Sequence, residues 1–226
     1  MTFLTRFHID PRSRAGAGVL ENPRRMHKVV AEATAKPNPQ DNEASGRTLW
    51  RLDRDSPADP LLWIVSPLRP ELDGFAADGG REVSGVVYES KLYDRLLARL
   101  DTGQVYAFRL AANAVHSGRR TPDSPETQRF AHVTASQQLS WLESRCEAHG
   151  FLLRKSSTGE PDAAVVGRRR FVFGHRDGRV TLTVSDFMGH LEVCDAALLQ
   201  RTLTRGMGHG RAYGCGLLTL AAPKRR

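Results

Sequence analysis

The stretch RGMGHGRAYGCGLLTLA, residues 205–221, decides how this chain completes its fold. It contains five glycines, which lack a Cβ and so let the backbone adopt positive φ angles or approach a ligand closely: Gly206, Gly208, Gly210, Gly214 and Gly216. A helix-like stretch precedes them, and an apolar strand, Leu217–Leu220, follows. Dinucleotide-binding folds and P-loops have the reverse order of strand, glycines and helix. The glycines therefore predict neither kind of nucleotide site.

The charge of the loop and of the whole chain points to a polyanionic partner. The loop has no acidic residue but carries Arg205, His209, Arg211 and Tyr213. The 226-residue sequence has 33 Lys and Arg against 25 Asp and Glu, a formal net charge of +8. A basic surplus dominated by arginine favours bidentate phosphate contacts and indicates nucleic acid. The other interpretation is a structural turn whose glycines only permit tight packing of a helix on a strand.

Hydrophobic periodicity predicts two similar halves. In the first half, Asn22 suits an N-cap and Pro23 suits the first position of a helix. The predicted order is strand, helix, strand, strand, helix, strand, over residues 3–9, 21–35, 48–52, 61–66, 91–100 and 104–112. This βαββαβ order is that of the ferredoxin-like fold.

The second half repeats this order less regularly. It predicts a helix over 135–149, a strand at 151–153, a hairpin of 165–173 and 179–187, a strand at 191–194, a helix over 195–205 and a closing strand at 217–220. We therefore predict an α+β fold with two tandem ferredoxin-like (RRM-like) domains. Residues 1–112 form the N-terminal domain, 113–133 a linker or long loop, and 134–226 the C-terminal domain.

Other features indicate a cytoplasmic protein. The first residues lack the continuous apolar core of a secretory signal. The sequence also has no run of 18 apolar residues, the length that would predict a membrane span. The three cysteines, Cys146, Cys194 and Cys215, are odd in number and far apart, which predicts reduced thiols. The sequence has no HExxH, CxxC or paired DxD motif, so we expect neither a metal nor another cofactor.

Four segments together resemble one known family: TRFHIDPRSR at the start, NPRRMHK, SWLESRCEAHGF and GMGHGRAYGCGLLTLA at the end. They are similar to the CRISPR repeat-processing endoribonuclease of type I-E systems, the CasE subunit of the Cascade complex. The resemblance covers most of the chain. It implies two ferredoxin-like domains, recognition of the repeat hairpin, and one metal-independent cut at its 3′ base. It also implies that the protein keeps the mature crRNA as a Cascade subunit in antiviral defence.

His27 has the most distinctive surroundings of the eight histidines. RNA cleavage without a metal uses the 2′-hydroxyl as nucleophile, so it needs a base, an acid and cations beside the phosphate. Imidazole suits either proton-transfer role because its reference pKa is near 6.5. Arg24, Arg25 and Lys28 lie beside His27 in the sequence and would stabilise the negative charge of the transition state. The alternative is a solvated basic helix face.

The resemblance implies that His27 is the catalytic histidine, because it occupies the histidine position of NPxxMH. Some family members have a tyrosine three residues earlier, where this chain has Arg24. Arginine cannot transfer protons at neutral pH, although it can hold the scissile phosphate. We therefore assign His27, Arg24 and Lys28 to the catalytic site. The candidates for a second proton-transfer group are Lys28, Tyr213 and His209.

A second basic cluster flanks the predicted hairpin turn and contains Arg168, Arg169, Arg170, Arg176 and Arg179. The resemblance implies that this hairpin enters the groove of the RNA stem. Because side chains alternate along a strand, Arg168 and Arg170 should share one face while Arg169 points away. The alternative is a charged edge strand that resists sheet pairing.

Further RNA contacts are expected from Arg119 and Arg120 in the linker, unless that segment is simply disordered. In the glycine-rich loop we expect contacts from Arg205, Arg211 and the five glycines. The expected partners are the CRISPR repeat RNA, as precursor and mature crRNA, and the other Cascade subunits. No membrane partner is expected, and outside the complex we expect a monomer.

Two other classes of function remain open from the sequence. One is a non-catalytic RNA-binding scaffold subunit of a ribonucleoprotein. The other is a nucleotide-dependent enzyme, which the order of elements around the glycines and the absence of GK[ST] disfavour.

Overall fold

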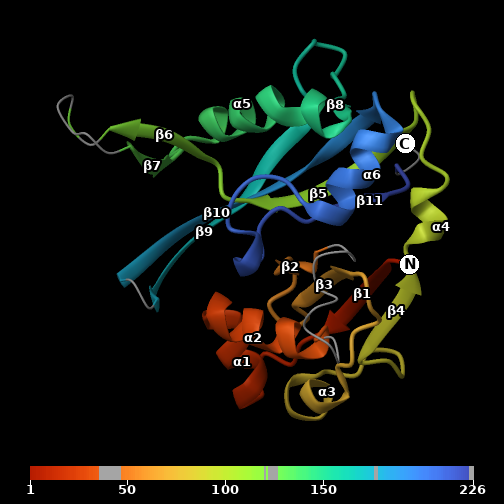
Figure 1. The fold of residues 1–226 in the computed structure, drawn as a ribbon, viewed down its shortest axis with the longest axis vertical. Helices are drawn as coiled ribbons and strands as arrows, with labels where there is room; N and C mark the ends of the chain where they lie inside the picture. The colour runs from red at the N-terminus through yellow and green to blue at the C-terminus, as the bar shows by residue number, and fades with distance from the viewer. Residues whose placement is uncertain (36–46, 120, 122–126, 176–177, 224–226) are drawn as a thin grey trace.

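The computed structural model describes residues 1–35, 47–119, 121, 127–175 and 178–223. Two α/β units lie one above the other, and the glycine-rich loop near the C-terminus lies between them (Figure 1). Each unit is built around an antiparallel sheet. Distant parts of the chain therefore meet at the interface between the units.

The first unit forms a sheet of order β2-β3-β1-β4. Its elements are β1 (Phe3–His8), α1 (Arg14–Glu21), α2 (Pro23–Ala33), β2 (Leu49–Asp53), β3 (Leu61–Ser66), α3 (Asp73–Gly79) and β4 (Tyr88–Leu92), with the short α4 (Asp94–Leu97) after it. Since β1 is central and its partners are β3 and β4, this is the strand order of a ferredoxin-like domain.

The second unit has a sheet of order β11-β5-β10-β8, with β9 added beside β10. Its elements are β5 (Val105–Ala112), β6 (Val115–Arg119), β7 (Thr127–Ala131), α5 (Ala135–Cys146), η2 (Glu147–His149), β8 (Phe151–Leu153), β9 (Ala163–His175), β10 (Gly178–Val193), α6 (Ala196–Arg205), η3 (Arg211–Tyr213) and β11 (Leu218–Ala221). Without β6, β7 and β9, the order again matches a ferredoxin-like domain. The predicted fold class is confirmed.

Local sequence signals fix several helix starts. The side chain of Asn22 accepts a hydrogen bond from the backbone N–H of Arg24, with Pro23 in the first turn of α2. Asp195 caps α6 in the same way through the N–H of Leu198. A capping side chain satisfies a donor that the first helical turn leaves free, so these boundaries follow from sequence.

The helix predicted over 91–100 is wrong for most of its length. Tyr88–Leu92 is instead strand β4, which pairs with β1, and the helix that follows is only Asp94–Leu97. Leu92 is 44% exposed, whereas Tyr93 is 3% exposed. The open edge of β1 supplies backbone partners that override a weak helical periodicity. Helices α1 and α3 were not predicted.

The role of 104–112 also needs correction. Strand β5 forms there, but it pairs with β10 and β11 and is the first strand of the second unit, not the last strand of the first. The pairing favours a domain boundary between Leu92 and Val105. Residues 113–133 are not a featureless linker either, because β6 and β7 form an antiparallel hairpin. The strand predicted at 191–194 belongs to the long β10.

A buried arginine joins the two units. Arg51 on β2 is 2% exposed. Its guanidinium donates to both carboxylate oxygens of Asp53 at 2.7 and 3.0 Å, and to the carbonyls of Arg109 and Leu217 at 2.9 and 3.2 Å. Leu49, also on β2, belongs to the apolar core of the second unit. The first sheet therefore packs on the second through shared core and buried polar contacts.

Candidate RNA-cleavage site

His27 lies on the side of α2 that faces the glycine-rich loop. Met26 and Val30 on the same helix are buried in the core of the first unit. This packing fixes the rotation of α2 and leaves the side chain of His27 exposed. Partial desolvation of the imidazole lowers the pKa of His27 below its ordinary value. The imidazole is therefore neutral at pH 7 and can accept a proton.

The glycine-rich loop, residues 206–216, takes the conformation that its glycines permit. Gly206, Gly208, Gly210, Gly214 and Gly216 all have positive φ, between 73° and 89°. At Gly214 a Cβ would lie closer than 3.0 Å to three carbons of Trp50. The indole Nε1–H of Trp50 also donates to the carbonyl of Ala212 at 3.2 Å. Trp50 therefore holds the 3₁₀ turn Arg211–Tyr213 against α2.

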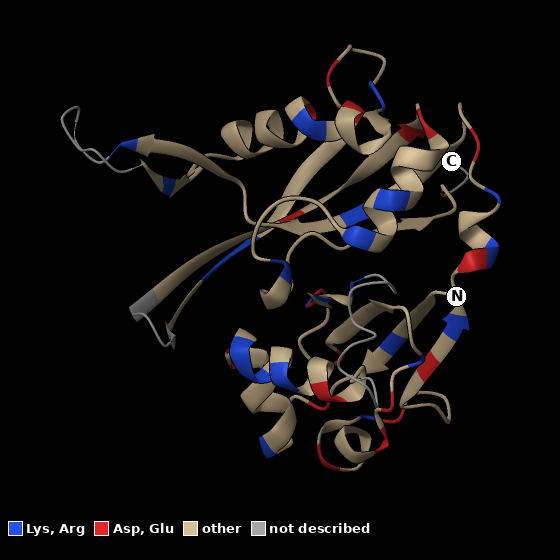
Figure 2. Ribbon diagram, in the orientation of Figure 1, with Lys and Arg blue, Asp and Glu red and all other residues tan. Residues whose placement is uncertain are grey.

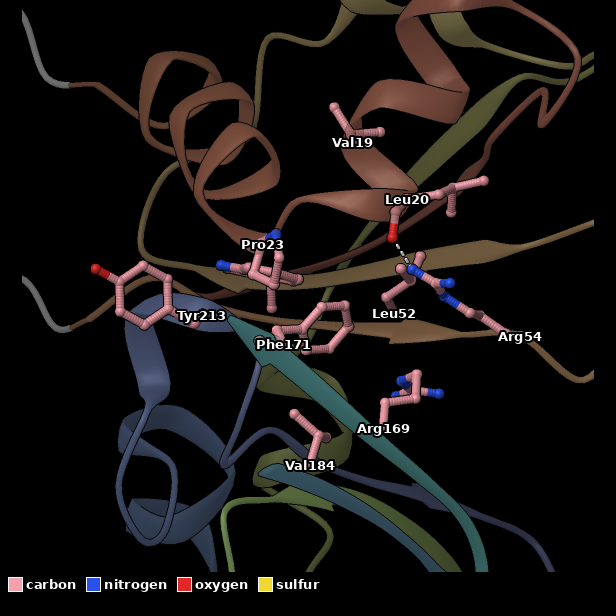
Figure 3. Close-up of a pocket in the computed structure, with 11 residues that line it drawn as sticks. Val19, Leu20, Pro23, Leu52, Arg54, Arg169, Phe171, Val184 and Tyr213 are labelled. Atoms are coloured by element: carbon pink, nitrogen blue, oxygen red, sulfur yellow. Dashed lines mark hydrogen bonds between the residues drawn. The ribbon is translucent and has the colours of Figure 1, made fainter. Parts of the chain in front are cut away.

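Tyr213 connects the glycine-rich loop with α2 and with strand β9 of the long hairpin. Its ring meets His27 edge-on, with ring centroids 6.0 Å apart, and meets Phe173 of β9 edge-on at 4.8 Å. In Figure 3, Tyr213 lies beside Pro23 with its hydroxyl directed away from a small cavity of about 20 Å³ between the units. Tyr213 thus links α2 and β9, two segments far apart in sequence, and lies against the imidazole of His27.

An open pocket of about 460 Å³ lies beside His27. Its walls include Arg47, Trp50 and Arg211, and none of the described residues lining it is acidic. Arg211 donates to the carbonyls of Arg205 and Gly206, both at 3.4 Å. Burial and then the charge of Arg47, which lines the same pocket, lower the pKa of Arg211. Such a pocket favours an anion.

The structure brings together only some of the cations predicted around His27. Arg24 donates to the carbonyl of Gly174 in β9 at 3.3 Å, so it joins α2 to the long hairpin. Lys28 faces a different groove, which it lines with Arg25, and its Nζ lies 3.7 Å from Glu32. His209, a candidate second proton-transfer group, lies in the loop, forms a backbone bridge with Asn113 and does not line the pocket beside His27. Of the three candidates, Tyr213 is the one in contact with His27.

The long hairpin β9–β10 shows the predicted alternation. Arg168 and Arg170 are exposed, and Arg168 donates to the carbonyl of Val133. Arg169 faces the other way and pairs with the buried Asp186 at 2.8 Å. Figure 2 shows the basic residues gathered on this hairpin, on α2 and on α6. The ion pair between Arg169 and Asp186 therefore joins the two strands of the hairpin.

Five other arginines were predicted to bind RNA. Arg119 is exposed at the end of β6, and Arg205 is exposed at the end of α6. Arg179 pairs through its backbone with Gly174 in the β9–β10 ladder. Arg120 and Arg176 lie outside the described residues.

The cysteines are free thiols, as predicted. Burial raises the pKa of Cys146 and of Cys215 to about 12 each.

In the described part of the chain, no group of three or more His, Cys, Asp or Glu side chains could hold a metal ion. No described helix is long and apolar enough to cross a membrane.

Comparison with known proteins identifies the family. The model of the family described as CRISPR associated protein matches residues 2–222. The chain belongs to this CRISPR-associated family. The CRISPR-associated endoribonuclease Cse3 of Thermus thermophilus is 32% identical over 225 residues, which cover 97% of this chain and 99% of that protein. The resemblance to the type I-E repeat-processing endoribonucleases is thereby confirmed.

Solved structures of the CRISPR-associated family agree with the fold. Thermus thermophilus Cse3 bound to an RNA representing a pre-cleavage complex matches with a TM-score of 0.76 and 28% identity, covering 97% of this chain and 98% of that one. Cas6e from Escherichia coli K-12 matches with a TM-score of 0.64 and 20% identity, covering 99% and 100%. At 20% identity, the similarity to Cas6e shows the fold alone.

Sequence reasoning missed Arg47 as a neighbour of His27. It lies 20 positions after His27 along the chain, and no motif connects the two. Tyr213 was one of three candidates, and nothing in the sequence set it apart from Lys28 and His209. Only the packing of the loop against α2 brings Tyr213 next to His27.

Proposed function

We propose that this protein is a metal-independent endoribonuclease that binds the hairpin of CRISPR repeat RNA and cuts at its 3′ base. The observation that carries the proposal is the contact of His27 with Tyr213 at the rim of a pocket whose charged lining residues are Arg47 and Arg211. A neutral imidazole, a hydroxyl and two guanidinium groups are the functional groups that cleavage of a phosphodiester by its own 2′-hydroxyl requires.

The groups divide the reaction between them as follows. The imidazole of His27 takes the proton of the 2′-hydroxyl, and the 2′-oxygen attacks the adjacent phosphorus. The bond from phosphorus to the 5′-oxygen breaks, and the leaving oxygen takes a proton from the hydroxyl of Tyr213. Arg47 and Arg211 stabilise the negative charge that builds on the phosphoryl oxygens. The products are a 2′,3′-cyclic phosphate and a 5′-hydroxyl end.

Arg24 has a supporting role in this arrangement. It stands where some relatives have tyrosine, and its side chain reaches the carbonyl of Gly174 instead of a proton-transfer position. Its contact fixes the long hairpin relative to α2. The exposed Arg168 and Arg170 on that hairpin bind the phosphates of the RNA stem. Lys28, which faces another groove, is not part of the cleavage pocket.

Product retention and assembly follow from the same interface. A tightly held stem would keep the mature crRNA bound after the cut and make the protein the subunit of a Cascade complex that carries it. Cleavage of the precursor RNA would then take place in the cytoplasm.

The chemistry is tested with a repeat RNA that has a 2′-deoxy nucleotide on the 5′ side of the cut. We expect this RNA to bind normally and to remain intact, while the all-ribose RNA is cut in EDTA to leave a cyclic phosphate. Cleavage of the deoxy RNA, or loss of activity in EDTA, would overturn the mechanism.

The role of His27 is tested by His27→Ala, with His190→Ala as the matched control. His190 is paired with Asp162, 2.9 Å away, on the second unit. We expect His27→Ala to lower the single-turnover rate by roughly 10²-fold or more, the usual contribution of an acid–base group, with little change in affinity. A fully active His27→Ala protein would remove His27 from the mechanism, whereas a wild-type protein that binds the repeat and never cuts it would be a scaffold.

A further inference from the structure

A second groove, of about 490 Å³, lies between the β6–β7 hairpin and α5. His116 and His132 form its wall on the hairpin side, and Trp141, Ser144 and Arg145 form its wall on the helix side. In Figure 1 the hairpin projects from the second unit beside the start of α5. The cleavage chemistry above uses no residue of this groove, although the volume is within the range of small-molecule and nucleotide sites.

The hairpin wall is a fixed aromatic surface. The ring of His116 stacks on Phe130 with centroids 5.9 Å apart, and lies 4.8 Å from the ring of His132. Backbone contacts hold His132 in place, because its N–H donates to the carbonyl of Ala114 at 2.9 Å and its own carbonyl accepts from Gln138 at 2.8 Å. His116 is exposed, so one face of this surface is open to a planar ligand.

The helix wall carries a fixed positive charge. The guanidinium of Arg145 lies 4.7 Å from the centre of the Trp141 ring, and donates to the carbonyl of Trp141 and the hydroxyl of Ser144, both at 3.0 Å. None of the described side chains lining the groove is acidic. A planar base against the histidines and a phosphate at the guanidinium would match these two walls.

Basic side chains connect this groove to the cleavage pocket. His209 in the glycine-rich loop forms a backbone bridge with Asn113, at the start of the β6–β7 segment. Burial, and then the charges of Arg129, Arg211 and Arg145, lower the pKa of His209. Arg211 lines the pocket of His27 and Arg145 lines the groove, so their charges reach the same imidazole from both sites.

At its other end the groove approaches the stem-binding hairpin. Arg168 donates to the carbonyl of Val133, the residue after His132. The groove thus lies between the proposed stem contacts of β9 and the loop beside His27. A strand of RNA that leaves the stem would pass along this surface.

We propose that the groove between β6–β7 and α5 binds unpaired RNA that flanks the repeat hairpin, with a base on His116 and His132 and a phosphate on Arg145. This site rests on the proposed function, because the hairpin and the cleavage pocket set the register of the RNA. It adds a subsite for single-stranded nucleotides to a protein that recognises a stem. Aromatic and cationic contacts of this kind tolerate many base sequences.

The experiment compares three RNAs with a 2′-deoxy block at the cut: the bare hairpin, the hairpin with five unpaired nucleotides on its 5′ side, and the hairpin with five on its 3′ side. Each extension carries 2-aminopurine next to the stem. Dissociation constants and 2-aminopurine fluorescence are measured for the wild-type protein, for His116→Ala/His132→Ala and for Arg145→Ala. Arg95→Ala/Arg99→Ala, on exposed positions of and beside α4, is the matched control.

For the wild-type protein and the control, we expect one of the two extensions to tighten binding by about tenfold, the value of one stacked base, and its fluorescence to be quenched. In the groove variants the gain and the quenching should disappear, while affinity for the bare hairpin stays within about twofold. Preserved affinity for the bare hairpin also shows that the variants are folded.

Each other outcome is decisive. If neither extension tightens binding to the wild-type protein, or if the groove variants keep the whole gain, the subsite does not exist. If the groove variants bind all three RNAs normally but no longer join the multi-subunit complex, the groove binds a protein and the RNA assignment is wrong. If even the bare hairpin fails to bind the wild-type protein, the proposed function itself fails.

Discussion

The change Gly214→Ala tests whether the glycine-rich loop positions the catalytic site. Gly214 has φ of +83°, and an added Cβ would lie closer than 3.0 Å to three carbons of the Trp50 ring. Gly159 is the matched control, because it also has φ of +83° but nothing lies within 4 Å of its added Cβ. The two variants therefore share the backbone strain and differ only in the collision with Trp50.

The expected energies follow from that difference. A left-handed conformation costs an L-residue about 1–2 kcal/mol, so Gly159→Ala should lower the free energy of unfolding by about that much. Gly214→Ala should lose a further ~1–3 kcal/mol, the usual cost of inserting a methyl group into a packed site. Trp50 is 4% exposed and its indole is bonded to Ala212, so it has little room to move. The turn that carries Tyr213 should move instead.

The assays are urea denaturation and single-turnover cleavage of repeat RNA with the protein in excess. A displacement of about 1 Å in a catalytic group can lower a rate by ~10²-fold, so we expect folded Gly214→Ala to cut slowly and Gly159→Ala to cut at the wild-type rate. Equal stability and equal cleavage rates for the two variants would show that Trp50 does not hold the turn against α2.

Three further predictions concern binding, pH and stability. Arg168→Ala/Arg170→Ala should weaken stem binding and reduce the slope of log affinity against log salt concentration by about one to two units, because each residue neutralises a phosphate. An unchanged slope would show that these two residues do not contact the RNA. The single-turnover cleavage rate should rise with pH and level off by about pH 7, because the neutral form of His27 is the base and burial lowers its pKa below the ordinary value. A rise centred above pH 7 would contradict the role of His27 as the base. Arg51→Met should lower the free energy of unfolding in urea by about 1–3 kcal/mol, because the carbonyls of Arg109 and Leu217 lose their donor while Asp53 keeps only its pair with Arg109; a loss below ~0.5 kcal/mol would mean that Arg51 does not hold the units together.

The sequence alone determined the fold class and most of the elements. Helix α2 follows from the Asn22 cap, the Pro23 start and the apolar spacing, and α6 follows from the Asp195 cap. These features act within one or two turns of helix, so no distant partner is needed to recognise them. The positive φ angles of the glycine-rich loop were likewise expected, because only glycine adopts them without strain. His27 could be chosen from eight histidines because a short motif and basic neighbours surround it.

The tertiary structure decided what depends on distant partners. Tyr88–Leu92 is a strand because β1 has a free edge, and Val105–Ala112 joins the second sheet because β10 and β11 lie beside it. Neither partner can be inferred from local periodicity. The same holds for the site: Tyr213 lies beside His27 because Trp50 holds the loop, and Arg47 lines the same pocket from just before the start of β2. Local chemistry fixed which residues could react, and the packing of the two sheets fixed which of them meet.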